Sequence, residues 1–158
     1  MFFDIPFVWP FTSIRELPPH QEESMKRREL REHIFELLFR IEFNCPEDMP
    51  EQIRLFFADM EELQETDQTY IEEKYARIVE KLPEIDRQIE ETAKSWKISR
   101  MGKVDLTILR LAVYEVEFDE DVPVGVAINE AVELSKKFGG DDSPAFVNGI
   151  LGKIGKKE

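Results

Sequence analysis

A cluster of basic side chains opens the first strongly helical stretch of the chain, and it consists of Lys26, Arg27, Arg28 and Arg31. The start of a helix carries unpaired N–H groups and the positive end of the helix macrodipole, so it favours anions and disfavours cations by roughly a few tenths of a kcal/mol each. A phosphate ligand is therefore one reason for placing four cations at this position. The alternative is simple solubility, or pairing with Glu29 and Glu32, and the cluster taken alone favours that alternative.

The side chains that most often carry catalysis are scarce. The chain has two His, His20 and His33, and one Cys, Cys45, and it lacks a nucleophile elbow, a phosphate-binding Gly loop and a dinucleotide fingerprint. A lone His inside a helix is usually a surface or core-edge residue. Adjacent carboxylates such as Glu61 and Glu62 point in different directions on a helix, so we expect a solvated face. The sequence predicts no enzyme, no metal site and no cofactor, and a single Cys forms no internal disulfide.

The charge of the chain is strongly uneven along its length. The formal net charge is −13, which by itself argues against nucleic acid. Residues 42–91 hold 16 acidic and 5 basic side chains, whereas residues 25–41 hold 5 basic and 3 acidic ones. Residues 92–158 are near balance, with 10 basic and 11 acidic side chains. We therefore expect one acidic side and one locally basic end.

Helical periodicity accounts for nearly all of the chain after Arg27. Apolar residues recur there at steps of three and four, and Pro46 ends the first helix. Further helices are predicted for about 50–63, from Thr66 or Asp67 to about Trp96 with a kink or break at Pro83, for 104–118, for 123–138, and from 141–143 to about Ile154. With few Gly and no alternating strand pattern, the sequence predicts an all-α fold of about seven helices.

Arg110, Asn129 and Asn148 are polar residues among the apolar residues of these helices. The 104–118 segment is apolar on nearly every side, so it should be the central buried helix. Arg110 within it needs a buried partner, and we expect an ion pair with a carboxylate of a neighbouring helix. Asn129 and Asn148 are expected to be hydrogen-bonded packing residues.

Residues 1–24 differ from the rest in having aromatic residues without helical period and four Pro, including the pair Pro18-Pro19. We expect a poorly ordered extension or a mis-assigned start, with the functional domain spanning 25–158. The alternative is that aromatic residues of this segment pack on the domain. The segment has no basic n-region, contains Asp4 and is broken by Pro6 and Pro10, so it resembles neither a signal peptide nor a membrane span. A cytoplasmic protein is expected.

Three segments in order resemble one known family. Residues 121–151, DVPVGVAINEAVELSKKFGGDDSPAFVNGIL, closely resemble the C-terminal signature of the NusB family. GKVDLTILRLAVYE at 102–115 is similar to the family's central helix, and RRELREHIFELLF at 27–39 to its arginine-rich first helix. The resemblance spans roughly 25–154, although the acidic middle matches only in helix count. The resemblance makes nucleic-acid binding the favoured interpretation of the basic cluster.

The resemblance implies two small helical bundles, roughly 25–82 and 83–158, and a non-catalytic antitermination factor. Such a factor pairs with NusE, a small-subunit ribosomal protein, binds single-stranded boxA-type RNA of ribosomal RNA leaders, and acts in an RNA polymerase antitermination complex. It implies that the basic cluster meets the RNA backbone and that a turn near the C-terminus contacts bases, through Lys136, Lys137, Phe138 and Asp142. There Phe138 would stack on an unpaired base and Asp142 would accept hydrogen bonds from base amino groups. Asp105 is the residue expected at the protein partner. A helical scaffold that binds only proteins is the alternative function.

Overall fold

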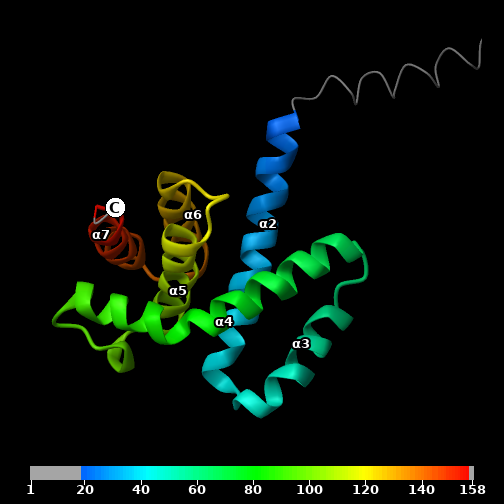
Figure 1. Ribbon diagram of the computed structural model, residues 1–158, viewed down its shortest axis with the longest axis horizontal. Coiled ribbons are helices and arrows are strands. Elements are labelled where there is room, and N and C mark those ends of the chain that lie inside the picture. The colour runs from blue at the N-terminus through cyan, green and yellow to red at the C-terminus, as the bar shows by residue number, and fades with distance from the viewer. Residues whose placement is uncertain (1–18, 157–158) are drawn as a thin grey trace, which may run out of the picture. The chain divides into compact units, whose positions relative to one another are not determined.

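The structure is a computed structural model that describes the backbone of residues 19–156 and the side chains of residues 27–156. Within that range the chain forms helices only, which confirms the predicted all-α class (Figure 1). The described residues form six α-helices, which are α2 (Pro19–Phe39), α3 (Met49–Ala58), α4 (Glu65–Ala93), α5 (Lys103–Phe118), α6 (Val124–Phe138) and α7 (Ser143–Gly155). Three 3-10 turns accompany them: η1 (Arg40–Phe43), η2 (Pro46–Asp48) and η3 (Ile98–Arg100).

The chain divides into two compact units, Met1–Arg31 and Glu32–Glu158. In the first unit, α2 begins at Pro19, inside the predicted extension of residues 1–24. Proline suits the first turn of a helix because the N–H group that it lacks has no partner there in any case. The rest of that extension, residues 1–18, lies outside the described residues, and the division of the domain near residue 82 stays a prediction.

The second unit is built around α5, which packs against α4, α6 and α7 (Figure 1). Ten of its 16 residues are buried, among them Ile108, Leu109, Leu111 and Val113. A helix that is apolar on nearly every side has no face to offer to solvent, so it takes the central position. The prediction of a central helix at 104–118 is confirmed.

Helix α4 runs unbroken through Pro83 for 29 residues. The ring of Pro83 is exposed, and Val79, whose carbonyl would otherwise accept the missing hydrogen bond, is also partly exposed. Solvent can therefore hydrogen-bond that carbonyl, and the apolar stripe of Ile78, Ile85 and Ile89 keeps both halves packed. The two predicted helical stretches on either side of Pro83 are thus one helix.

Helix α3 ends at Ala58, five residues before the predicted end at Leu63. The residues that follow include Asp59, Glu61 and Glu62. Negative side chains at a helix C-terminus repel the partial negative charge of the last carbonyl groups. The prediction of a helix for 59–63 was wrong, because it followed the spacing of the apolar residues and gave too little weight to these charges.

A buried ionic cluster joins α4 to the end of α5. The Lys74 ammonium donates to Glu115 Oε2 at 2.8 Å and lies 3.1 Å from Asp119 Oδ2. Burial alone would lower the pKa of Lys74, but the charges of Glu115 and Asp119 and the nearby Tyr70 phenol outweigh it and raise that pKa. The contact between Lys74 and Glu115 therefore helps to fix the register of α4 on α5.

Candidate nucleic-acid interface

The basic cluster lies on α2, within the first unit. The side chains of Arg27 and Arg28 are exposed, whereas Arg31 is only 7% exposed. All three take part in interactions of their own, and the side chain of Lys26 lies outside the described residues. An incoming phosphate can therefore reach Arg27 and Arg28 directly, while Arg31 serves packing as well as charge. The sequence does not distinguish these roles because all four residues are cations on one helix.

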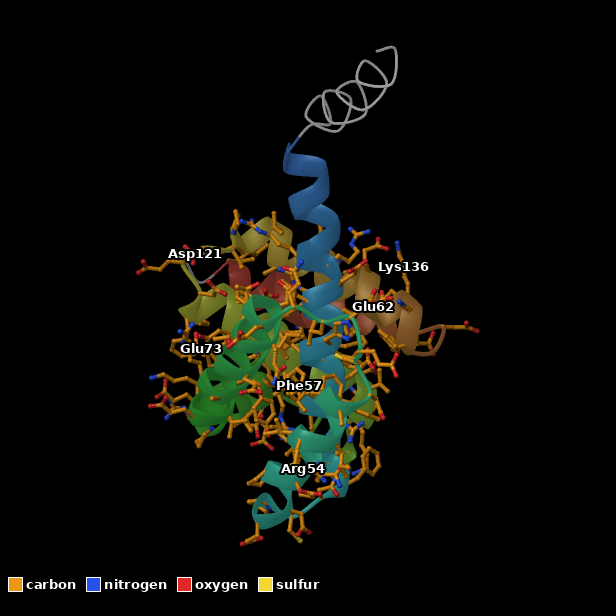
Figure 2. All side chains as sticks on the ribbon, turned by 90° about the vertical axis from the view of Figure 1, so that its right-hand side faces the viewer. Arg54, Phe57, Glu62, Glu73, Asp121 and Lys136 are labelled. Atoms are coloured by element: carbon orange, nitrogen blue, oxygen red, sulfur yellow. The ribbon has the colours of Figure 1, made fainter. Side chains whose placement is uncertain are left out.

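The second predicted group lies at the end of α6, within the second unit. Lys136 and Lys137 are both exposed in its last turn, and Lys136 projects from the ribbon in Figure 2. Lys136 Nζ lies 3.3 Å from Glu133 Oε1, and Lys137 Nζ donates to Glu32 Oε2 at 2.7 Å. Cations are favoured at this end of a helix by the macrodipole. The helix therefore holds two positive charges at its exposed end.

The ring of Phe138 is half-buried, and one of its faces is already occupied. It stacks on Phe35 with centroids 4.8 Å apart and an angle of 29° between the planes. Lys137 Nζ lies 5.4 Å from the centroid of the same ring. A base that stacked on Phe138 would have to use what remains of this half-buried ring, beside the Lys137 ammonium. The predicted stacking role stays a prediction.

A tight turn connects α6 to α7 and fixes the position of Asp142. Gly139 N donates to Ser135 O at 2.9 Å, and Gly140 N donates to Ser143 Oγ at 3.0 Å. A Cβ on Gly139 would lie 2.5 Å from Ser143 Oγ, so this position requires glycine. Asp142 is exposed at the N-cap of α7 without a side-chain cap hydrogen bond, because Ser143 closes the turn instead. The side chain of Asp142 is thus exposed to solvent at the end of this turn.

A separate surface surrounds Asp105 in the first turn of α5. Phe43 of η1 is 60% exposed, and Lys103 Nζ lies 5.3 Å from its ring centroid and 4.0 Å from Glu42 Oε2. Asp105 is half-buried, and its buried Oδ1 has no hydrogen-bond partner among the described residues. The sequence pattern pointed to Asp105 and not to Phe43. The one sign of Phe43 in the sequence is that this aromatic residue does not continue the apolar stripe of the first helix.

The expected ion pair of Arg110 is confirmed. Its guanidinium donates through Nε and Nη2 to the two oxygens of Asp86, at 2.9 and 3.0 Å, and through Nη1 to Glu42 Oε1 at 3.1 Å. These bonds tie α5 to α4 and to η1. The expectation for Asn129 and Asn148 was wrong, because both are exposed on the outer faces of α6 and α7.

The described residues contain no group of three or more His, Cys, Asp or Glu side chains that could hold a metal ion. His33 lies 3.7 Å from Glu36 and edge-on to Phe56, so it packs at the edge of the core. Among the helices in the described range, none is both long and apolar enough to cross a membrane.

Comparison with known proteins identifies one family. Residues 28–156 match the NusB family. The transcription antitermination protein NusB of Lachnoclostridium phytofermentans is 52% identical over 130 residues, which are 82% of this chain and 98% of that protein. A solved structure of T. maritima NusB has 34% identity and a TM-score of 0.74, and covers 84% of this chain and 92% of that one. A structure of antitermination factors NusB and NusE in complex with dsRNA has 26% identity and a TM-score of 0.72, over 85% of this chain and 98% of that one.

Proposed function

This chain belongs to the NusB family, and we propose that it acts in transcription antitermination as an adaptor that contacts RNA through its own side chains. It is an antitermination factor and not an enzyme. It pairs with NusE and binds RNA, as the NusB relative solved with NusE and dsRNA does. Its place of action is the cytoplasm, where RNA is transcribed in bacteria.

The observation that carries the RNA contact is the turn after α6. Two exposed lysines and the exposed Asp142 surround a turn whose shape depends on Gly139 and Ser143. Lys136 and Lys137 supply charges for phosphates, and Asp142 supplies an acceptor for base amino groups. Arg27 and Arg28, exposed on α2, supply further phosphate contacts from the first unit.

We propose that the preferred RNA is a single strand of the boxA type. Unpaired bases expose their hydrogen-bonding edges and ring faces, which Asp142 and Phe138 can use, whereas a duplex presents mainly its backbone. The net charge of −13 makes the free protein a weak binder of any RNA. A partner that adds positive charge beside the RNA therefore raises its affinity.

We propose the surface around Asp105 as the NusE contact. Phe43 offers an exposed aromatic ring, and Asp105 adds a half-buried carboxylate in the first turn of α5. Interfaces draw much of their affinity from aromatic anchors and from polar groups that find a partner on binding. Asp105→Asn and Phe43→Ala are expected to weaken NusE binding without changing RNA binding by the free protein.

Titration of RNA at several salt concentrations tests the RNA contact. If about four phosphates are neutralised, the logarithm of affinity falls against the logarithm of salt with a slope of roughly −3 for a single strand. Lys136→Gln with Lys137→Gln, or Arg27→Gln with Arg28→Gln, should each make the slope shallower by about 1.4. The control is Arg54→Gln with Arg77→Gln, two exposed cations on α3 and α4, which should leave the slope unchanged.

The second candidate function is a helical scaffold that binds proteins alone. The excess of carboxylates over residues 42–91, some of them labelled in Figure 2, favours it. In that case NusE is captured normally, and neither cation pair changes RNA binding or its salt dependence. Duplex RNA of the same sequence is run in parallel, and equal affinity for duplex and single strand would contradict the single-strand preference.

A further inference from the structure

The connection between α4 and α5 is the most basic stretch of an otherwise acidic chain. Residues 94–103 contain Lys94, Lys97, Arg100 and Lys103 and no carboxylate, although the whole chain has a net charge of −13. Lys94, Lys97 and Arg100 are exposed, and none of these three is paired with a carboxylate among the described residues. Cations elsewhere in the second unit, such as Arg54 and Arg77, lie beside glutamates. This stretch therefore offers unneutralised positive charge.

An exposed tryptophan lies in the middle of this basic connection. Trp96 is 52% exposed, and its ring meets Phe146 of α7 edge-on, with centroids 6.0 Å apart and an angle of 75° between the planes. With 52% of this side chain exposed, indole surface remains open to a ligand. A large aromatic side chain in solvent among cations is the combination that binds single strands, because bases stack on the ring while phosphates meet the cations.

The backbone of the connection holds Trp96 in place. Ile98 N donates to Glu90 Oε1 at 3.3 Å, Arg100 N donates to Lys97 O at 2.9 Å, and Met101 is buried. Lys94 has φ of 53°, in the left-handed region, and is the one non-glycine residue of the described chain with positive φ. A side chain there costs energy, and such strain is kept where the surrounding structure determines the conformation. The loop is thus shaped in advance, which reduces the ordering cost of binding.

This surface adjoins the turn that carries the proposed RNA contact. Phe146, on which Trp96 packs, lies one helical turn after Asp142, and Phe146 N donates to Asp142 O at 3.1 Å. We propose that residues 94–100 form a second RNA-binding surface, in which Trp96 stacks on an unpaired base and Lys97 and Arg100 bind phosphates of the same strand. The inference rests on the proposed RNA-binding function and extends it from the α6–α7 turn along the start of α7.

Tryptophan fluorescence tests the stacking directly. The chain has two tryptophans, so Trp9→Phe in the full-length protein leaves Trp96 as the single emitter. Titration with a boxA-type single strand, in the presence of NusE, should quench this emission and protect it from acrylamide. Unchanged emission at saturating RNA would overturn the proposal.

Affinity measurements separate the two kinds of contact. Trp96→Ala should weaken RNA binding about five-fold or more, and Trp96→Phe should retain most of the affinity, because stacking on an aromatic ring is tolerant of ring type. Lys97→Gln with Arg100→Gln should make the salt slope shallower by about 1.4. The control Leu55→Ala removes an apolar side chain of similar exposure from α3. It should change neither the RNA affinity nor its salt dependence.

The outcomes distinguish this surface from the function on which it rests. If the unmodified protein binds RNA and Trp96→Ala binds equally well, the surface is not an RNA contact while the α6–α7 turn remains one. If Trp96→Ala weakens capture of NusE and leaves RNA binding intact, the surface belongs to a protein and the proposal is overturned. If the unmodified protein with NusE binds no RNA, the proposed function fails together with this inference.

Discussion

Lys137 Nζ donates a hydrogen bond to Glu32 Oε2 at 2.7 Å, so residues 105 positions apart in sequence meet at the proposed RNA-binding turn. Glu32 is half-buried and Lys137 is exposed. The pair therefore holds the lysine in one position and also neutralises it. If RNA binds this turn as proposed, it has to compete with the Glu32 carboxylate for the Lys137 ammonium, and the pair then sets part of the affinity.

Glu32→Gln is expected to raise RNA affinity by about two- to five-fold at low salt. The substitution frees Lys137 and removes a negative charge near the strand, and an exposed ion pair contributes roughly 0.2–1 kcal/mol. The gain should shrink as salt is added, because screening weakens both effects. Equilibrium titration with RNA measures the affinity of this variant. The control is Glu73→Gln on α4, which should leave the RNA affinity unchanged. An affinity that stays equal or falls contradicts the role of this pair.

Gly139→Ala is expected to lower the free energy of unfolding by about 1–3 kcal/mol, because its Cβ would overlap Ser143 Oγ and force the turn to move. RNA affinity should fall as well, since the turn positions Lys136 and Asp142. Gly140→Ala is the matched control, because a Cβ there meets nothing within 4 Å. Urea denaturation of both variants tests the difference, and equal stability would show that the turn relaxes without cost.

Arg110→Lys is expected to destabilise the protein by about 1–2 kcal/mol. A lysine ammonium cannot reproduce the two parallel hydrogen bonds to Asp86 and still reach Glu42, so at least one of these hydrogen bonds is lost. Arg54→Lys, in an exposed pair with Glu51, should change stability by less than about 0.5 kcal/mol. Thermal and urea unfolding compare the two variants, and a similar effect of both would mean that the Arg110 pair behaves as a surface pair.

Between pH 8 and about pH 10 the free energy of unfolding should be constant, and it should fall at higher pH. Burial raises the pKa of Tyr75 and Tyr114 above the ordinary value of 10.0, and the carboxylates around Lys74 raise its pKa above 10.5. The folded state then keeps protons that the unfolded state releases, so this stability is complete below the unfolded pKa values and is lost as the pH rises from them through the higher folded-state pKa values. Tyr75→Phe should make the alkaline slope of stability shallower, as measured by urea titration from pH 8 to about pH 11. An unchanged slope would show that Tyr75 does not contribute to the loss of stability at high pH.

Helix identity was largely predictable, whereas several helix boundaries were not, among them both ends of α2, which runs from Pro19 to Phe39 and not from about Arg27 to Pro46. The apolar periodicity located α5, α6 and α7 closely, because a buried stripe has to repeat with the helical turn. It failed at the end of α3 and at Pro83 of α4, where end charges and the exposure of a single proline decide the outcome. Such effects are small in free energy, and the packing of neighbouring helices can outweigh them.

The chemistry of the candidate site was also partly visible in the sequence. The segment from Lys136 to Asp142 and the basic cluster stood out by residue type and by resemblance to the family. Pattern alone did not show that Arg31 is buried, that Phe138 stacks on Phe35, or that Trp96 is exposed in a basic loop.

The sequence by itself determined the all-α class, the central helix and the residues that could meet RNA, because these follow from periodicity and local residue types. Only the tertiary structure decided which of those residues reach solvent and which carboxylates neutralise them. Lys137 illustrates this, since its hydrogen-bond partner Glu32 is brought to it by the packing of α2 against the end of α6, across 105 residues of chain. Contacts of that range depend on the fold as a whole and leave no local pattern.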